Sequence, residues 1–190
     1  MMGAAPGAGA TRLHVAQTEE IDPDTFDRLT ALCEAAFEEP FAPVWERVGP
    51  GIHVFLEGDG RLVAHAMIVD RRLYIGHEGD LALDVGYVEN VATHPELHGR
   101  GHGTRVMREI GRIVGDEYVL GALATDRNAF YERLGWETWR GPTWVRMLDG
   151  QRIRSAHEDG DVMVMRTPRT PPDLDLAGPI AVDWRPEEPW

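Results

Sequence analysis

The feature that most constrains this chain is a change of hydrophobic period on the two sides of a glycine cluster. Residues 81–93, LALDVGYVENVAT, read as a long strand, and residues 104–115 carry apolar side chains at the spacing of an amphipathic helix. The stretch between them has glycine at three alternate positions, Gly99, Gly101 and Gly103. A strand that enters a glycine-rich turn and opens a helix is typical of an α/β fold.

The same stretch places three histidines four residues apart, which raises the possibility of a metal site. His94, His98 and His102 would share one face of a helix, and imidazole is a zinc ligand. A helix here would have to include Pro95, at about 3 kcal/mol, and three glycines, at about 1 kcal/mol each. No carboxylate or cysteine stands at a supporting spacing. We therefore predict no metal.

The glycine turn is better interpreted as an anion site. The N–H groups at a helix N-terminus point outward, and glycine lets a phosphate approach the backbone. Arg100 can add a charge-assisted contact. A dinucleotide fingerprint starting at Gly99 fails, because its third glycine position is Thr104. A tight turn without a ligand is the alternative.

Composition narrows the function classes. The chain of 190 residues is long enough for one domain, which we place at residues 11–190 after a flexible leader at residues 1–10. A net charge of −13 argues against nucleic acid and favours a cationic partner. All 19 basic residues are arginine, so a Schiff-base lysine and a Walker A loop are excluded. With no apolar run that could span a membrane and one cysteine, Cys33, we expect a cytoplasmic protein.

The remaining pattern predicts a mixed sheet with helices. Asp22 or Asp24 can cap a helix that runs to about residue 38, and a loop with Pro40, Pro43 and Trp45 follows. Early hairpins and later crossovers then coexist. The expected strands are 12–17, a hairpin over 51–69, 117–124 and 161–166, and a further helix is expected over 127–134.

The motif HGRGHGT (98–104) resembles the acetyl-CoA pyrophosphate loop of the GNAT acetyltransferases, written (Gln/Arg)-x-x-Gly-x-(Gly/Ala). His98 departs from the first position, whereas Gly101 and Gly103 match. NAFYERLGW (128–136) is similar to a later helix of that family. Across residues 11–190, the segments GYVENVATHP, YVLGALA, FYERLGW, RGPTWV and VDWRPEEPW resemble aminoglycoside 2′-N-acetyltransferases.

This resemblance implies a GNAT-type fold, a mixed and mostly antiparallel central sheet flanked by helices, with acetyl-CoA as co-substrate. Pantetheine would pair with the backbone of Val91 and Thr93. Asn128, about one turn before Tyr131 on the same helical side, is expected to contact the cofactor. The pyrophosphate would bind the N–H groups of His98, Gly99, Arg100, Gly101, His102, Gly103 and Thr104.

Two residues are candidates for the chemistry. Glu89 shares a strand face with Leu83, Val85, Tyr87 and Val91 by counting in twos, an unusual place for a carboxylate. A partly buried carboxylate can bind an ammonium group and relay its proton. A solvent-facing strand end, or a bulge that turns the face, is the alternative. The resemblance assigns Tyr131 as the acid that protonates the thiolate; a core aromatic is its alternative.

Aminoglycosides are polycations, so the resemblance implies an acidic acceptor site. Its predicted residues are Glu89, Asn90, Ala124, Glu158, Glu188 and the terminal carboxylate of Trp190. The chain departs from the expected acids after the first helix, where it has Pro40 and Val44; Glu38 and Glu39 lie nearby.

We therefore predict acetyl transfer to the 2′-amine of aminoglycosides, conferring antibiotic resistance, by a homodimer. An acetyltransferase for another small amine or a peptide N-terminus, and a non-catalytic protein that kept the fold, are the alternatives.

Overall fold

The computed structural model describes residues 11–77 and 81–190, so the predicted leader lies outside the described residues. The helices are α1 (Pro23–Phe37), α2 (Ala42–Val48), α3 (His102–Glu117) and α4 (Asn128–Glu132), with 3-10 turns η1 (Thr18–Glu20), η2 (Pro95–Leu97) and η3 (Ala156–Glu158). The strands are β1 (Arg12–Gln17), β2 (Ile52–Gly58), β3 (Arg61–Ile75), β4 (Leu81–Thr93), β5 (Leu120–Ala124), β6 (Glu137–Thr138), β7 (Thr143–Arg146), β8 (Arg152–Arg154), β9 (Val162–Arg166) and β10 (Ile180–Asp183).

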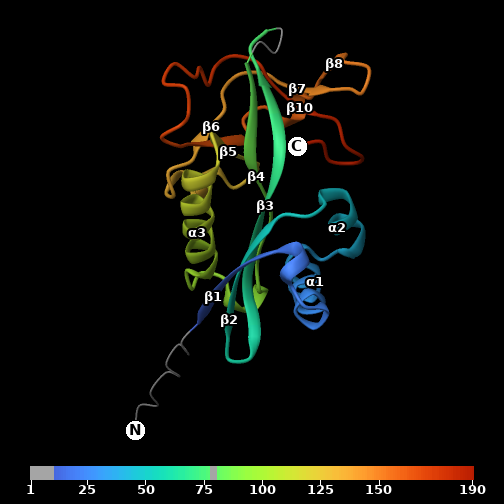
Figure 1. The fold of residues 1–190 in the computed structure, drawn as a ribbon, viewed down its shortest axis with the longest axis vertical. Coiled ribbons are helices and arrows are strands. Elements are labelled where there is room, and N and C mark those ends of the chain that lie inside the picture. Colours follow the sequence, from blue (N-terminus) through green and yellow to red (C-terminus); the bar gives the residue numbers. More distant parts are fainter. Residues whose placement is uncertain (1–10, 78–80) are drawn as a thin grey trace.

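The described strands form one ten-stranded sheet in which β3 has a central place. It pairs antiparallel with β2, β4 and β10, while β4–β5 and β10–β7 are parallel pairs. Figure 1 shows α3 on one side of the long β3–β4 pair and α1 and α2 on the other. The predicted mixed, mostly antiparallel sheet flanked by helices is confirmed.

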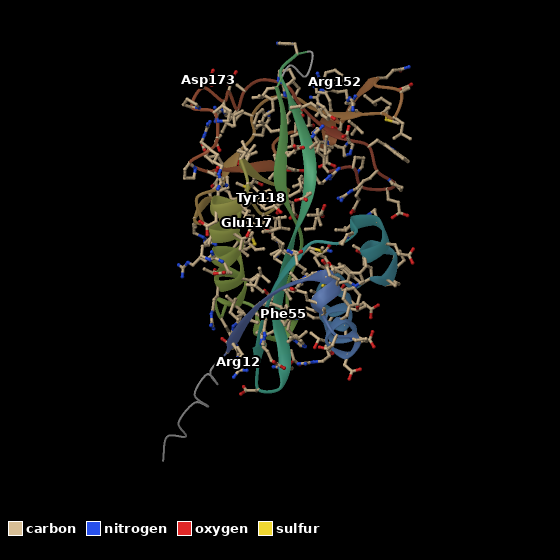
Figure 2. All side chains as sticks on the ribbon, viewed as in Figure 1. Arg12, Phe55, Glu117, Tyr118, Arg152 and Asp173 are labelled. Carbon is tan, nitrogen blue, oxygen red and sulfur yellow. The ribbon has the colours of Figure 1, made fainter. Side chains whose placement is uncertain are left out.

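Alternate residues of β2 explain why both sheet faces are covered. Val54 and Leu56 pack in the cluster that contains the buried stripe of α3, whereas Phe55 packs with α1 on the opposite face (Figure 2). The five apolar residues of the α3 stripe are each at most 2% exposed. Burying one such side chain stabilises the fold by about 1.5 to 3 kcal/mol.

Several predicted boundaries need correction. The expected loop around Pro43 is wrong: this segment forms α2, because proline in the first helical turn is compatible with a helix. The expected strand start at Glu117 is also wrong, since α3 continues to that residue. The next residue, Tyr118, reaches across to β3, where its hydroxyl donates to Asp70 Oδ1 at 2.9 Å (Figure 2). The sequence has no clear hydrophobic period over the short strands β6, β7, β8 and β10.

A β-bulge interrupts β4 just after Glu89. The register with β3 steps from Met67↔Glu89 to His65↔Ala92, so two residues of β4 lie opposite one residue of β3. Asn90 has a positive φ of 56° at this point. As a result Val91 packs in the α3-side cluster, whereas Tyr87 belongs to the cluster on the other face. The prediction that Glu89 and Val91 share a face is therefore wrong.

A chain of buried hydrogen bonds ends on this bulge. The Asn90 carbonyl can only accept, so His65 Nδ1 donates to it at 3.0 Å. His65 Nε2 then accepts from His53 Nδ1 at 3.0 Å, and the Thr18 hydroxyl lies 3.0 Å from His53 Nε2. Both rings are fully buried. Burial lowers the pKa of His53 to about 4, and burial together with His53 lowers the pKa of His65 to about 3.

The buried pair of His53 and His65 should make the stability of the fold depend on pH. Below the usual histidine pKa of 6.5 the unfolded chain takes up protons that the folded chain refuses, so stability falls as pH drops towards 4. Between pH 7 and pH 4.5 we expect a loss of about 2 to 3 kcal/mol per histidine. Urea unfolding across this range should show a shallower pH slope for His65→Gln than for the natural chain. An unchanged slope would contradict the assignment; His157→Gln, at an exposed side chain, is the control.

Candidate active site

The site begins where β4 leaves β5. Within the described residues these strands pair only at Gly86↔Gly121 and Tyr87↔Ala122, although β4 continues to Thr93 and β5 to Ala124. A Cβ at Gly86 would lie 2.8 Å from the Tyr118 ring, so the close contact between β4 and this ring requires glycine at position 86. Beyond Tyr87, the described residues include no strand partner for the edge of β4 that faces β5, and an extended ligand could pair there.

A cavity of about 960 Å³ opens at this divergence. Of the predicted site residues, all of which are described, only Arg100 and Asn128 lie outside its lining. The predicted residues that line it are Glu89, Asn90, Val91, Thr93, His98, Gly99, Gly101, His102, Gly103, Thr104, Ala124, Tyr131, Glu158, Glu188 and Trp190. Residues far apart in the sequence thus converge on one hollow.

The glycine turn forms one end of this cavity. Gly99 and Gly101 have φ values of 74° and 81°, in the left-handed region that favours glycine. A Cβ at Gly103 would lie 3.0 Å from Thr93 Oγ1. Because α3 begins at His102, its first N–H groups have no partner within the helix and can bind an anion.

The histidines of this stretch do not form a metal site on one helical face. His94 accepts from the Glu96 N–H at 3.4 Å in η2, and His98 Nε2 donates to the Thr93 carbonyl at 2.9 Å. Only His102 belongs to α3, where burial and the nearby Arg100 and Arg105 lower its pKa. In the described part of the chain, no group of three or more His, Cys, Asp or Glu residues is arranged to hold a metal ion.

Glu89 lines the cavity as a buried carboxylate. Its side chain is 13% exposed, and burial raises its pKa. The Arg185 guanidinium, with Nη1 2.7 Å from Glu89 Oε1, opposes this shift, as does Arg71. A carboxylate with a raised pKa takes up a proton more readily at neutral pH than an exposed one, which suits a general base.

Tyr131 brings a phenol to the same cavity from α4. Its ring meets those of Phe130 and Trp136 edge-on, at centroid distances of 4.9 and 6.3 Å. Burial raises the pKa of its hydroxyl to about 12. Tyr131 therefore keeps its proton at neutral pH and can donate it to a leaving group.

Asn128 has a structural position instead of one in the cavity. Its amide donates to Thr138 Oγ1 at 3.0 Å and to the Gly160 carbonyl at 2.8 Å. These bonds tie the start of α4 to β6 and to the turn before β9. The prediction that Asn128 contacts the cofactor rests on the helical side that it shares with Tyr131. In the structure, however, Asn128 does not line the cavity.

The sequence did not indicate two arginines at or beside the cavity. Arg47 of α2 lines the cavity, and its guanidinium contacts Glu187 and Glu188 of the C-terminal tail. Arg185 does not line the cavity but contacts Glu89, as described above. Val44 and Glu39 also line the cavity, so Glu39 is the acid after α1 that reaches it.

Comparison with known proteins identifies relatives of this chain. Residues 17–139 match the acetyltransferase (GNAT) domain family. The chain is similar to an aminoglycoside 2′-N-acetyltransferase of Mycolicibacterium fortuitum, with 34% identity over 186 residues, which cover 94% of this chain and 93% of that protein.

Solved structures show the same fold. The GNAT family N-acetyltransferase YhbS from Escherichia coli, in complex with CoA, has a TM-score of 0.61 at 15% identity, covering 95% of this chain and 93% of that one. A GCN5-related N-acetyltransferase from Kribbella flavida has a TM-score of 0.57 at 20% identity. The match covers 73% of this chain and 36% of that chain.

The chain therefore belongs to the GNAT acetyltransferase family, whose members use acetyl-CoA. In the part of the chain that the structure describes, no helix is both long and apolar enough to cross a bilayer.

Gly101 tests the anion-binding turn. Gly101→Ala places a Cβ at a φ of 81°, where the left-handed conformation costs about 1 to 2 kcal/mol for other residues. We expect the dissociation constant for CoA, measured by calorimetry, to rise about tenfold. Gly115→Ala in the same helix, with open space around its Cβ and no positive φ, is the matched control. Equal CoA affinity in both variants would remove the turn from the binding site.

Proposed function

We propose that this protein transfers the acetyl group of acetyl-CoA to the 2′-amino group of an aminoglycoside by direct transfer. The observation that carries the proposal is the placement of Glu89 and Tyr131 in one cavity beside the unpartnered edge of β4. The homodimer and the resistance role that the resemblance implies stay predictions.

The chain's own residues divide the chemistry. The backbone of Val91 and Thr93 would hold an extended pantetheine arm, and the first turn of α3 would hold the pyrophosphate. Glu89 would accept the proton of the ammonium group so that the neutral amine can attack. Tyr131 would return a proton to the departing thiolate. Acetyl-CoA supplies the activated acyl group.

The acceptor class is supported by charge and by similarity. Glu158 and Glu188 bring carboxylates to the cavity, which Trp190 also lines, and burial raises the pKa of Glu158. The similar protein of Mycolicibacterium fortuitum is named an aminoglycoside 2′-N-acetyltransferase. A polycationic amine satisfies several such acids together, whereas exposed pairs contribute little singly.

Another small amine or a peptide N-terminus is the second candidate. The observation that favours it is the apolar Val44 and the cationic Arg47 at the cavity wall after α1, where acids were expected. Such a wall would accept a less highly charged substrate.

Kanamycin B and kanamycin A separate these candidates, because they differ by an amine or a hydroxyl at the 2′ position. We expect CoA thiol release with kanamycin B and none with kanamycin A. Turnover confined to simple amines or peptides would overturn the aminoglycoside acceptor and keep the acetyltransferase. CoA binding without turnover on any amine would favour the non-catalytic alternative.

Replacing Glu89 tests the base. Glu89→Gln should lower kcat by about a hundredfold or more while CoA affinity changes little. In the natural chain, kcat/KM should fall as the pH drops through the raised pKa of Glu89, because the protonated carboxyl cannot take the amine's proton. This acid limb should disappear in Glu89→Gln. Full activity of the variant at neutral pH would exclude Glu89 as the base.

A further inference from the structure

Arg185 joins the candidate base to the end of the chain. Its side chain is 12% exposed and makes three contacts. Nη1 lies 2.7 Å from Glu89 Oε1, Nε donates to the Glu188 carbonyl at 2.5 Å, and Nη2 donates to Trp190 O at 3.3 Å. One guanidinium therefore neutralises Glu89 and holds the tail beside it.

A second arginine holds the same tail from the other side. The Arg47 side chain, also 12% exposed, has Nη1 2.5 Å from Glu187 Oε2 and Nη2 2.9 Å from Glu188 Oε2. Glu89 and Glu188, two acids expected to receive a cationic acceptor, are thus each paired with an arginine. Glu158 has a weaker partner, with His157 Nε2 at 3.3 Å on a largely exposed side chain.

A buried carboxylate needs a cation beside it whenever it is ionised. Leaving one partner of a buried ion pair alone is strongly unfavourable, so the free protein supplies Arg185 where a bound acceptor would supply an ammonium group. A single ammonium group gains little by this exchange. A polycation gains more, because it can also meet Glu158 and the tail acids.

We propose that Arg185 is a specificity-determining residue: its guanidinium competes with the acceptor's ammonium group for Glu89, which favours polycationic acceptors over monocationic ones. The proposal rests on the proposed function, since it deepens the acceptor specificity of the same site. Arg185 need not leave the tail, because its contacts with Glu188 and Trp190 use other guanidinium nitrogens.

Arg185→Gln removes the competitor, and glucosamine, which has one amine, serves as the monocationic probe beside kanamycin B. The natural enzyme should discriminate strongly in kcat/KM between these two acceptors. In the variant we expect this ratio to fall about tenfold or more, mainly through a lower KM for glucosamine. The comparison belongs at a pH where Glu89 is ionised in both proteins. An unchanged ratio would overturn the proposal.

Two further variants separate competition from a loosened tail. Arg47→Gln removes the contacts with Glu187 and Glu188 but leaves the Glu89–Arg185 contact in place, so its selectivity ratio should not fall, because freeing Glu188 favours the polycation further. Arg185→Lys keeps a positive charge only while the amine is protonated, so it should retain part of the selectivity and lose it as the pH rises. A similar fall of the ratio in Arg47→Gln would overturn the proposal in favour of tail disorder.

Titration of Glu89 in the free protein needs no acceptor. The charged and titratable groups beside it are Arg185, Arg71, Tyr87 and Glu188. Removing Arg185 removes a positive charge, so carbon NMR, assigned with Glu89→Gln, should show a higher Glu89 pKa in Arg185→Gln. An unchanged titration would overturn the proposed contact. Absence of kanamycin B turnover in the natural chain would instead overturn the proposed function, and the titration would still decide whether Arg185 and Glu89 interact.

Discussion

The divergence of β4 from β5 after Tyr87 is the constraint on which the rest of the site depends. Opening two neighbouring strands leaves backbone donors and acceptors without partners, which is costly unless something else satisfies them. The bulge at Asn90 lies in the pairing of β4 with β3, where His65 of β3 donates to the Asn90 carbonyl. The edge of β4 that faces β5 beyond Tyr87 is left available to an extended ligand, which can satisfy it.

Burial acts on the two candidate catalytic groups in the same direction with different consequences. It raises the pKa of Glu89 and that of Tyr131. For the carboxyl, this brings proton uptake closer to neutral pH, where a base is useful. For the phenol, the raised pKa keeps the hydroxyl protonated at neutral pH, so the proton stays on the oxygen until a stronger base develops beside it. Burial thus suits each group to its proposed role, with Arg185 limiting the shift at Glu89.

Local signals in the sequence predicted part of this arrangement. Asp22, one of the two predicted candidates, is the N-cap of α1 and accepts from the Thr25 N–H, and the apolar stripe of α3 is buried as expected. The glycines at 99 and 101 adopt the left-handed conformations that such a turn uses. These features depend on residues close together in the chain, so their spacing carried the information.

What the sequence did not predict depends on contacts between distant segments. Counting in twos assigned Val91 to the face of Glu89, and only the register with β3 reveals the bulge that separates them. Asn128 could be placed on the correct helix but not relative to the cavity. Arg185 stood in a distinctive C-terminal motif, yet nothing near it in the chain indicates a buried carboxylate on β4 as its partner.

The use of arginine at this contact has a chemical reason that composition alone could not supply. All basic side chains of the protein are arginine, which stays charged even when buried, whereas a buried lysine readily loses its proton. The planar guanidinium also presents several donors, so Arg185 can bind Glu89 and the tail together. Because Arg185 does not lose its proton, its own titration does not release Glu89. While Glu89 stays ionised and buried, only another cation can replace Arg185 beside it. The proposed competition at this contact therefore selects among amines.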